Sequence, residues 1–470
     1  MSATAIPPRR GAVARQGGRP PVVSPRETIA SVTDRITGVA LDKKTPRWWW
    51  AGMAMAGALL GWGAFSVGWL FSNGIEVWGN DWPVMWGFPI LNYVWWIGIA
   101  SGGTMISSLF FVTKSKWRSA VSRLAETVTL LAAACAGIYP IVHLGRPWFF
   151  YWLFPYPNTM TLWPQFRSPL LWDFIAVITY ILASAMFWVL GALPDFAALR
   201  DKATRRPAQV LYGVLAMGFR GTEPQWRRFH ATYGTIAPIM APLVVSVHSV
   251  VGLDFAGAAF PGWYSTQYPP FFVFGAVLSG FGVVLMLIVP LRAALGLKPD
   301  ITQRHLDVLG RLLLVTSLAL GYCYMMDAWE PFYASDKAGR VQFIARVFGA
   351  YGWIYWLTLA LNVAVPQLLW SGRMRARPPV LFLVGFSVFV GMWLERFQIV
   401  EVELHRPRLP SAWGFYWPTV WDWGVFAGTA GIFLSGVLLF VRFMPVIAIS
   451  EMRELIESGG SAPRNQRAQT

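Results

Sequence analysis

Long apolar blocks, separated by short stretches rich in Gly, Pro and charged residues, dominate this sequence of 470 residues. The first block runs from Trp48 to Phe71. Because roughly twenty apolar residues in a helix cross a hydrocarbon core of about 30 Å, the pattern predicts an all-α integral membrane protein with about ten transmembrane helices. The later blocks are centred on Ile99, Ala134, Ile178, Val244, Leu285, Val315, Leu359, Phe386 and Ile432.

Basic residues mark one side of the predicted spans. The formal net charge of +16 could suggest a nucleic-acid-binding protein. Lys and Arg nevertheless concentrate before the first span and in alternate loops, whereas the loops over residues 72–88 and 256–270 contain neither. Since cytoplasmic loops are enriched in Lys and Arg, the pattern predicts a bacterial cytoplasmic membrane protein with both termini in the cytoplasm, and it explains the charge without nucleic acid.

The charge pattern also divides the chain. We expect a cytoplasmic N-terminal tail over residues 1–47, a transmembrane domain surrounded by lipids over residues 48–445, and a cytoplasmic C-terminal tail over residues 446–470. No cleavable signal peptide is evident, because the first apolar run is long and follows a polar, Pro- and Arg-rich stretch. That composition predicts a flexible N-terminal tail.

Several kinds of redox and nucleotide chemistry lack their sequence motifs. The only two cysteines, Cys135 and Cys323, lie in separate apolar blocks, and the five histidines are scattered. There is no CxxC motif, no Walker loop, no dinucleotide-binding glycine fingerprint and no zinc-protease motif. We therefore expect no haem, iron–sulfur cluster or metal site in this chain, so that any redox centre belongs to a partner protein.

Three ionisable side chains are predicted to meet at the outer rim of the membrane. His143 ends the third span, Asp173 opens the fourth and Asp254 ends the fifth, so the alternating topology places them on one side at similar depth. Ionisable groups near hydrocarbon are costly and often functional. Each one alone is more commonly a helix cap or a group that meets interfacial water, but their shared depth favours a common site.

An imidazole beside carboxylates suits the oxidation of a quinol, which loses two protons and two electrons. Apolar surroundings would admit an isoprenoid tail while a few polar groups orient the head. Tyr139, one turn before His143, could line the same cavity, although interfacial tyrosines are common. His248 lies about 9 Å deeper than Asp254 and well round the helix. We expect it to form a hydrogen bond between helices, with a role in a proton path as the alternative.

At these residues the sequence resembles the NrfD/PsrC family of quinone-interacting membrane subunits, and within it most closely the C subunits of bacterial alternative complex III. The resemblance covers most of the chain. The motifs that carry it are His143-Leu144-Gly145-Arg146-Pro147-Trp148, Trp172-Asp173, Ser246-Val247-His248-Ser249-Val250-Val251 leading to Asp254-Phe255, and Glu395-Arg396-Phe397.

This resemblance implies two four-helix bundles, over about residues 89–254 and 271–400, with the first and tenth spans as two peripheral helices. It implies that menaquinol or ubiquinol binds at the outer end of the first bundle. His143 and Asp173 would contact the quinol head and Asp254 would assist proton release, with Tyr139 and Arg146 as further candidate contacts.

The resemblance also implies partner proteins. Electrons would pass to an extracytoplasmic iron–sulfur subunit, then through multihaem cytochrome c subunits to a terminal oxidase or a soluble electron carrier. A paralogous NrfD-like membrane subunit would belong to the same complex.

Other functions stay open at this point. The chain could be a non-catalytic paralogous subunit, although the set of His143, Asp173 and Asp254 argues against that. It could be a secondary transporter, but transporters usually carry their charges at the membrane midplane. A purely structural anchor would not need three ionisable groups at one depth. Proton translocation is also open, with candidate carboxylates at Glu126, Asp307, Asp327, Glu330 and Glu395.

Overall fold

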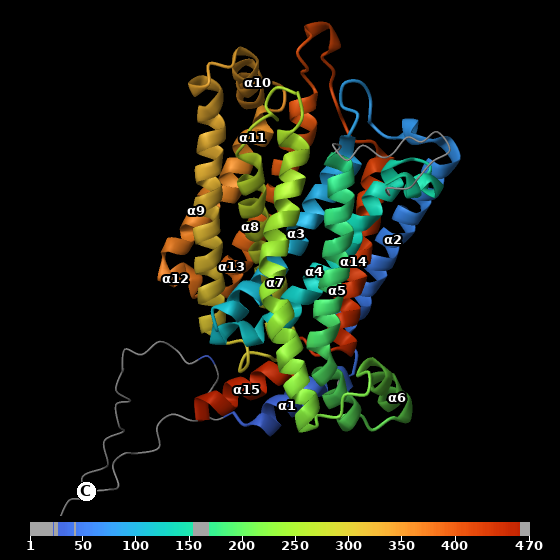
Figure 1. The fold of residues 1–470 in the computed structure, drawn as a ribbon, viewed down its shortest axis with the longest axis vertical. Coiled ribbons are helices and arrows are strands. Elements are labelled where there is room, and N and C mark those ends of the chain that lie inside the picture. The colour runs from blue at the N-terminus through green and yellow to red at the C-terminus, as the bar shows by residue number, and fades with distance from the viewer. Residues whose placement is uncertain (1–21, 23–26, 42–43, 154–168, 461–470) are drawn as a thin grey trace, which may run out of the picture.

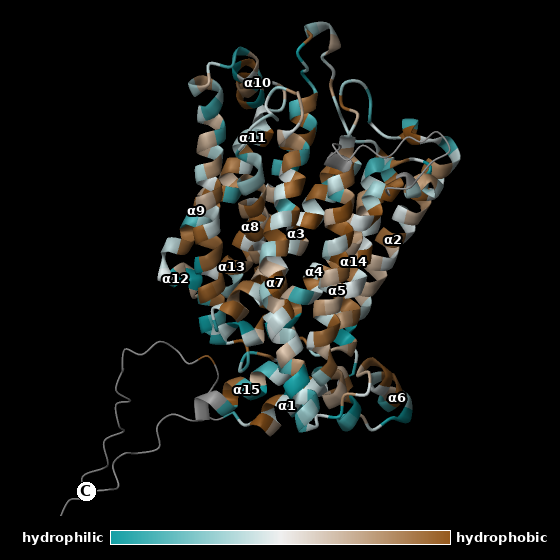
Figure 2. Cartoon of the chain, viewed as in Figure 1, coloured by the Kyte–Doolittle hydropathy of each residue, from teal (hydrophilic) through white to brown (hydrophobic). Residues whose placement is uncertain are grey.

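The computed structural model describes residues 22, 27–41, 44–153 and 169–460, and the figures show the rest as a thin grey trace. In this part of the chain ten helices are long and apolar enough to cross a membrane, and no β-strand occurs. Every predicted block centre lies in one of them. Hydrophobic residues dominate the middle of the molecule and hydrophilic residues its ends (Figure 2). The protein is therefore an all-α integral membrane protein, as the sequence predicted.

The helix bounds are as follows. The spans are α2 (Arg47–Asn73), α3 (Gly87–Val112), α4 (Ser122–His143), α5 (Pro169–Lys202), α7 (Glu223–Ala256), α8 (Tyr268–Ala294), α9 (Gln303–Tyr333), α11 (Gly352–Leu359) continued by η4 (Ala360–Ala364) and η5 (Val365–Trp370), α13 (Pro378–Phe397) continued by η6 (Gln398–Val402), and α14 (Val420–Phe443). The shorter helices are α1 (Ile29–Leu41), η1 (Ile75–Val77), η2 (Lys116–Ala120), η3 (Pro147–Leu153), α6 (Arg206–Leu215), α10 (Lys337–Phe348), α12 (Gly372–Arg375), η7 (Pro410–Ala412) and α15 (Ile449–Gly460).

Two groups of four spans each form a closed ring of contacts. In the first bundle α3 contacts α4, α4 contacts α5, α5 contacts α7, and α7 returns to α3. In the second bundle α8, α9, the α11–η5 span and α13 do the same. The first and tenth spans, α2 and α14, pack against each other, and α14 also contacts α4. This is the arrangement that the family resemblance implied.

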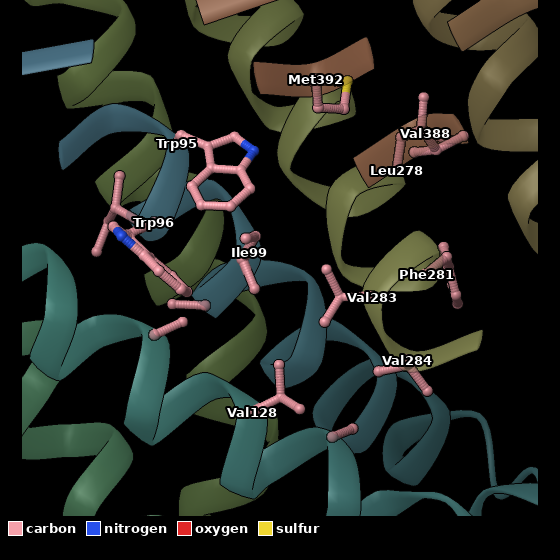
Figure 3. Packing of buried hydrophobic residues seen from close by; sticks show 14 of the residues in the cluster. Trp95, Trp96, Ile99, Val128, Leu278, Phe281, Val283, Val284, Val388 and Met392 are labelled. Carbon is pink, nitrogen blue, oxygen red and sulfur yellow. The ribbon is translucent and has the colours of Figure 1, made fainter. Parts of the chain in front are cut away.

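The two bundles meet where α3 and α8 cross. A Cβ atom built on Gly102 would lie 2.3 Å from the Cα of Gly280, and one on Gly280 would lie 2.2 Å from the Cα of Gly102. The backbones therefore touch at these glycines, as small residues allow between membrane helices. Figure 3 shows the apolar side chains that pack beside α3 and α8, among them Trp95, Trp96, Ile99, Leu278, Phe281, Val283 and Val284.

The prediction of a flexible N-terminal tail is wrong for residues 29–41, which form α1. Val32, Ile36 and Val39 recur every three to four residues and are all buried, so α1 has the apolar stripe of an amphipathic helix. It contacts α15 of the C-terminal tail, and both lie at the end of the molecule opposite α10 (Figure 1). Residues 1–21, 23–26, 42–43 and 461–470 of the two tails lie outside the described residues.

We call the end with α10 the cavity end and the end with α1 and α15 the tail end. The chain alternates between them, so α4, α7 and α9 finish at the cavity end, where α3, α5 and α8 begin (Figure 1). Residues near these six helix termini therefore gather at one end although they are far apart in sequence.

Candidate functional site

A cavity of about 310 Å³ lies at the cavity end, between α3, α4, η3, α5 and α7. The ionisable side chains among its described lining are His143, Asp173, Asp254 and Tyr93. All other lining residues are apolar or glycine: Trp86, Ile90, Val94, Gly137, Pro140, Ile141, Leu144, Phe150, Leu153, Phe174, Val177, Ile178, Ile181 and Phe255. The structure therefore brings the three residues singled out from the sequence into one apolar cavity.

Helix termini hold these side chains in place. His143 is the last residue of α4, and Asp254 lies in the last turn of α7. Asp173 lies in the second turn of α5, which starts at Pro169, and Tyr93 lies two turns into α3. Because two of these helices end at the cavity end and two begin there, all four side chains can line one cavity.

The carboxylates of the cavity are only partly satisfied by the described residues. The Tyr93 hydroxyl donates a hydrogen bond to Oδ2 of Asp173. Oδ1 of Asp173 and Oδ1 of Asp254 are buried and have no hydrogen-bond partner there. Asp173 and Asp254 line the same cavity, and Tyr93 lines it with them. Buried polar atoms without partners are expensive, so these oxygens are suited to receive the hydroxyl groups of a ligand.

His143 combines a polar edge with an aromatic support. Its ring stacks on Trp78, with the ring centroids 6.2 Å apart and an interplanar angle of 11°. Its Nδ1 atom is buried and has no hydrogen-bond partner among the described residues. The stacking fixes the plane of the imidazole, so the ring can bind a polar group in one defined direction.

Two of the sequence candidates do not line the cavity. The Tyr139 hydroxyl is 2.7 Å from the hydroxyl of Thr429 on α14, which places this buried ring on another face of α4. Arg146 is exposed beyond Gly145, a residue at φ +68° that turns the chain out of α4. Tyr139 was a candidate because it lies one turn before His143, but the packing of α14 against α4 gives its hydroxyl a partner in Thr429 instead.

The structure adds one residue and corrects another. Tyr93 was missed because a tyrosine near a span end looks like any interfacial tyrosine, and no sequence signal marks its contact with Asp173. His248 was expected to form a hydrogen bond between helices. It is buried on α7, but neither ring nitrogen meets a partner on another described helix. His248 does not line the cavity either.

The carboxylates considered for proton transfer lie away from the cavity, and each contacts a donor or a cation. Glu126 accepts from Arg123 and Tyr233, Asp307 from Arg311 and Arg375, Asp327 from Arg346, Glu330 from Ser265, and Glu395 from Tyr324 with Arg396 alongside. Within the described residues no group of three or more His, Cys, Asp and Glu side chains is arranged to hold a metal ion.

The sequence matches the family described as "Polysulphide reductase, NrfD" over residues 76–405, a range that contains both bundles and the cavity. The chain belongs to the NrfD family. NrfD-family subunits bind quinone in the membrane and are membrane subunits of oxidoreductase complexes. The likeness to the C subunit of alternative complex III in particular stays a prediction.

Similar proteins come from bacteria and archaea. A protein of Halobacterium salinarum that is named as a reductase membrane subunit is 26% identical over 84% of this chain and 91% of its own. The C subunit of the selenate reductase of Mesobacillus selenatarsenatis is 22% identical over 80% of this chain and 88% of its own. The Hdr-like menaquinol oxidoreductase integral membrane subunit of Archaeoglobus fulgidus is 23% identical over 79% of this chain and 88% of its own.

Proposed function

We propose that this chain binds and oxidises quinol in the cavity between α3, α4, α5 and α7. It would serve as the membrane subunit of a respiratory or photosynthetic quinol:electron-acceptor oxidoreductase of the alternative complex III type. The observation that carries the proposal is the meeting of His143, Asp173 and Asp254, each with a buried unpartnered polar atom, in an otherwise apolar cavity. The name of the Archaeoglobus relative, a menaquinol oxidoreductase subunit, supports it.

The geometry suits a head group with a hydroxyl at each end and an apolar tail. One quinol hydroxyl would donate to Oδ1 of Asp173 and the other to His143, while the apolar lining accommodates the ring and the start of the tail. Trp78 keeps the imidazole in place and Tyr93 keeps the carboxylate in place, so both acceptors are oriented before quinol arrives.

The reaction balances as quinol giving quinone, two protons and two electrons. Each quinol O–H bond breaks as the ring is oxidised, and its proton moves to His143 or Asp173, which act as general bases. Asp254, which lines the same cavity as Asp173, would take a proton onward. Menaquinol and ubiquinol share this chemistry, and both head groups are candidate substrates.

The electrons must leave through a partner, because this chain contains no haem or iron–sulfur motif. We propose an extracytoplasmic iron–sulfur subunit at the cavity end as the acceptor. Multihaem cytochrome c subunits, a paralogous NrfD-like subunit, and a terminal oxidase or soluble electron carrier would complete the chain of transfer. Proton translocation coupled to this reaction would need a route that includes the carboxylates outside the cavity.

Asp173→Asn tests the proposal in the purified native complex. Quinol-dependent reduction of the copurified haem should slow by about 100-fold at matched amounts of the complex, because asparagine keeps the shape but cannot accept the proton. Glu76→Gln is the control, since Glu76 is exposed at the same end and lines no part of the cavity. Equal rates for the native and Asp173→Asn complexes would mean that the chain is an anchor or a non-catalytic paralogue.

A further inference from the structure

A second pocket, of about 210 Å³, lies at the cavity end over the second bundle. Its walls come from the loop before α8, the end of α9, α10 from its N-cap to its last turn, and Glu403 just beyond η6. The chain links the two sites directly, because Asp254 and Phe255 in the last turn of α7 line the first cavity, and Gly262 and Ser265 in the following loop line this second pocket.

The lining of this pocket is strongly acidic. Asp327, Glu330, Asp336 and Glu403 contribute four carboxylates and Arg346 the one cation, so the formal charge of the described lining is −3. Arg346 binds both Asp327 and Glu403, with 2.8 Å between Nη1 of Arg346 and Oε1 of Glu403. It cannot balance the charge of the other two carboxylates.

The remaining acidic side chains interact with neutral donors. The Ser265 hydroxyl donates to Glu330 and the Tyr264 hydroxyl donates to Asp336. Neutral donors satisfy the hydrogen-bonding capacity of a carboxylate in part but leave its charge uncompensated. A cation entering the pocket would therefore gain an attraction that no described residue of the lining supplies.

Glu403 shows that the pocket is built to hold something. Its side chain is 1% exposed, yet its Oε2 atom has no hydrogen-bond partner among the described residues. Gly262 leaves room for that oxygen, since a Cβ atom at Gly262 would lie 2.2 Å from it. The pKa of Glu403 is raised, because burial outweighs the opposing effect of Arg346. An entering cation would act on Glu403 in the same direction as Arg346.

Two neighbouring arginines point elsewhere. Arg340 donates to the backbone carbonyls of Pro331 and Phe332, and Arg408 donates to that of Ala259. Neither contributes to the pocket lining. These two arginines therefore do not fill the pocket, which stays open to a positive charge from another molecule.

We propose that this pocket receives a lysine or arginine side chain of a protein subunit that docks on the cavity end. Its volume far exceeds the roughly 10–15 Å³ that a single water needs, so it fits an extended cationic side chain better than a bare ion. This docking role goes beyond quinol oxidation and holds whichever cavity reaction the chain carries out.

Carboxyl footprinting tests the proposal even when the partner is unidentified. Carbodiimide and glycinamide are applied to the native complex and to the full chain purified alone, and the modified carboxylates are located by peptide mass spectrometry. Glu330 and Asp336, which are half-buried at the pocket rim, should be modified at least tenfold less in the complex, whereas the exposed Glu76 should react equally in both. Equal modification of Glu330 and Asp336 in both samples would overturn the proposal.

Two further arms separate docking from other causes. The double variant Asp336→Asn with Glu330→Gln keeps a capping side chain at the start of α10. It should release the partner subunit at about 0.5 M salt. A thermal unfolding transition of the released chain would show that the variant is still folded. Full retention of the partner would overturn the proposal. Protection of Glu330 in the isolated chain by added calcium, reversed by a chelator, would instead assign the pocket to a metal ion and also overturn it.

Discussion

Tyr93 donates its hydroxyl to one oxygen of Asp173 and leaves the other buried without a described partner. In an apolar cavity this single contact decides which oxygen a ligand can reach. An acceptor that is already oriented does not have to reorganise when quinol binds. The contact between Tyr93 and Asp173 should therefore affect the rate of quinol oxidation more than the stability of the fold.

Tyr93→Phe tests this at the residue scale. Without the hydroxyl, Oδ2 of Asp173 loses its partner, which costs about 1–3 kcal/mol. We expect quinol oxidation to slow by at least about fivefold while the complex stays assembled. Steady-state kinetics at varied quinol concentration would measure the effect on kcat and on KM separately.

Tyr139→Phe is the matched control for that experiment. Tyr139 is also a buried tyrosine of the first bundle, but its hydroxyl meets Thr429 on α14 instead of the cavity. Its removal should cost some stability and leave quinol kinetics unchanged. If Tyr139→Phe slowed the reaction as much as Tyr93→Phe, both effects would be structural and Tyr93 would have no special role.

The sequence predicts the end of the membrane at which a residue lies, but not the direction in which its side chain points around the helix. His143, Asp173 and Asp254 could be placed together because each lies at a span terminus, and the positive-inside pattern assigns the terminus to a side. Tyr139 lies one turn before His143 on the same helix, yet its hydroxyl contacts Thr429 on α14. Rotation about the helix axis depends on how the helices pack, and the packing partners were not known from the sequence.

At the scale of elements, the α3–α8 crossing connects the two bundles through bare backbone. Even one added methyl group at Gly280 would overlap the backbone of Gly102, so the helices would have to separate. Gly280→Ala should lower the free energy of unfolding by about 1–3 kcal/mol, as overpacking usually does. Thermal unfolding of the purified chain in detergent measures this change.

Gly57→Ala controls for the general effect of replacing a helix glycine. Gly57 lies within α2, and a Cβ atom built on it has no neighbour within 4 Å. The replacement should leave stability unchanged or raise it slightly, since alanine is the better helix former. A similar loss of stability for Gly57→Ala and Gly280→Ala would contradict the close crossing of α3 and α8.

The docking of α1 depends on a different interaction. Arg35 donates two hydrogen bonds to Asp300, whose side chain is completely buried in the loop between α8 and α9. The middle of α1 is thereby joined to the second bundle. Neither partner could be identified from the sequence, because Arg35 lies in a polar tail and Asp300 in a connecting loop that is 265 residues away.

Arg35→Ala should destabilise the protein by up to about 3 kcal/mol, because it leaves a buried carboxylate unpaired. Burial raises the pKa of Asp300 and Arg35 lowers it, so the variant raises that pKa further. A carboxyl group whose pKa is raised in the folded state stabilises the fold at low pH, where it is protonated, and this stabilisation is lost as the pH rises through the folded-state pKa. The loss of stability caused by Arg35→Ala should therefore be larger at about pH 8 than at about pH 5.

Thermal unfolding at the two pH values checks this expectation. Arg227→Ala serves as the control, since its pair with Glu223 is exposed on both sides and such pairs contribute little. A deficit for Arg35→Ala that is equal at both pH values would show that Asp300 does not respond to the loss of its partner.

For the molecule as a whole, the sequence predicted the ten spans because each is a long apolar block whose length is set by the membrane. It missed α1 and α15, whose apolar stripes are short and lie in polar stretches. Amphipathic helices of this kind are stabilised by tertiary contacts more than by their own composition. The acidic pocket could not be predicted from the sequence either, since Asp327, Asp336 and Glu403 come from three separate elements.

The distribution of basic residues predicts how the molecule is oriented in the membrane. Lys202, Arg205 and Arg206 lie at the tail end, whereas residues 72–88 at the cavity end contain no Lys or Arg. The tail end should therefore face the cytoplasm and the quinol cavity the outside. Glu76→Cys and Asp201→Cys place a thiol at an exposed position of each end, and the two native cysteines, Cys135 and Cys323, are buried.

A membrane-impermeant maleimide applied to intact cells should label Glu76→Cys and leave Asp201→Cys unlabelled until the membrane is opened. The native protein, treated in the same way, gives the background labelling of the two buried cysteines. The reverse labelling pattern would place quinol oxidation on the cytoplasmic side. Proton release and the electron-accepting subunit would then have to lie in the cytoplasm, and the extracytoplasmic iron–sulfur partner proposed above would be ruled out.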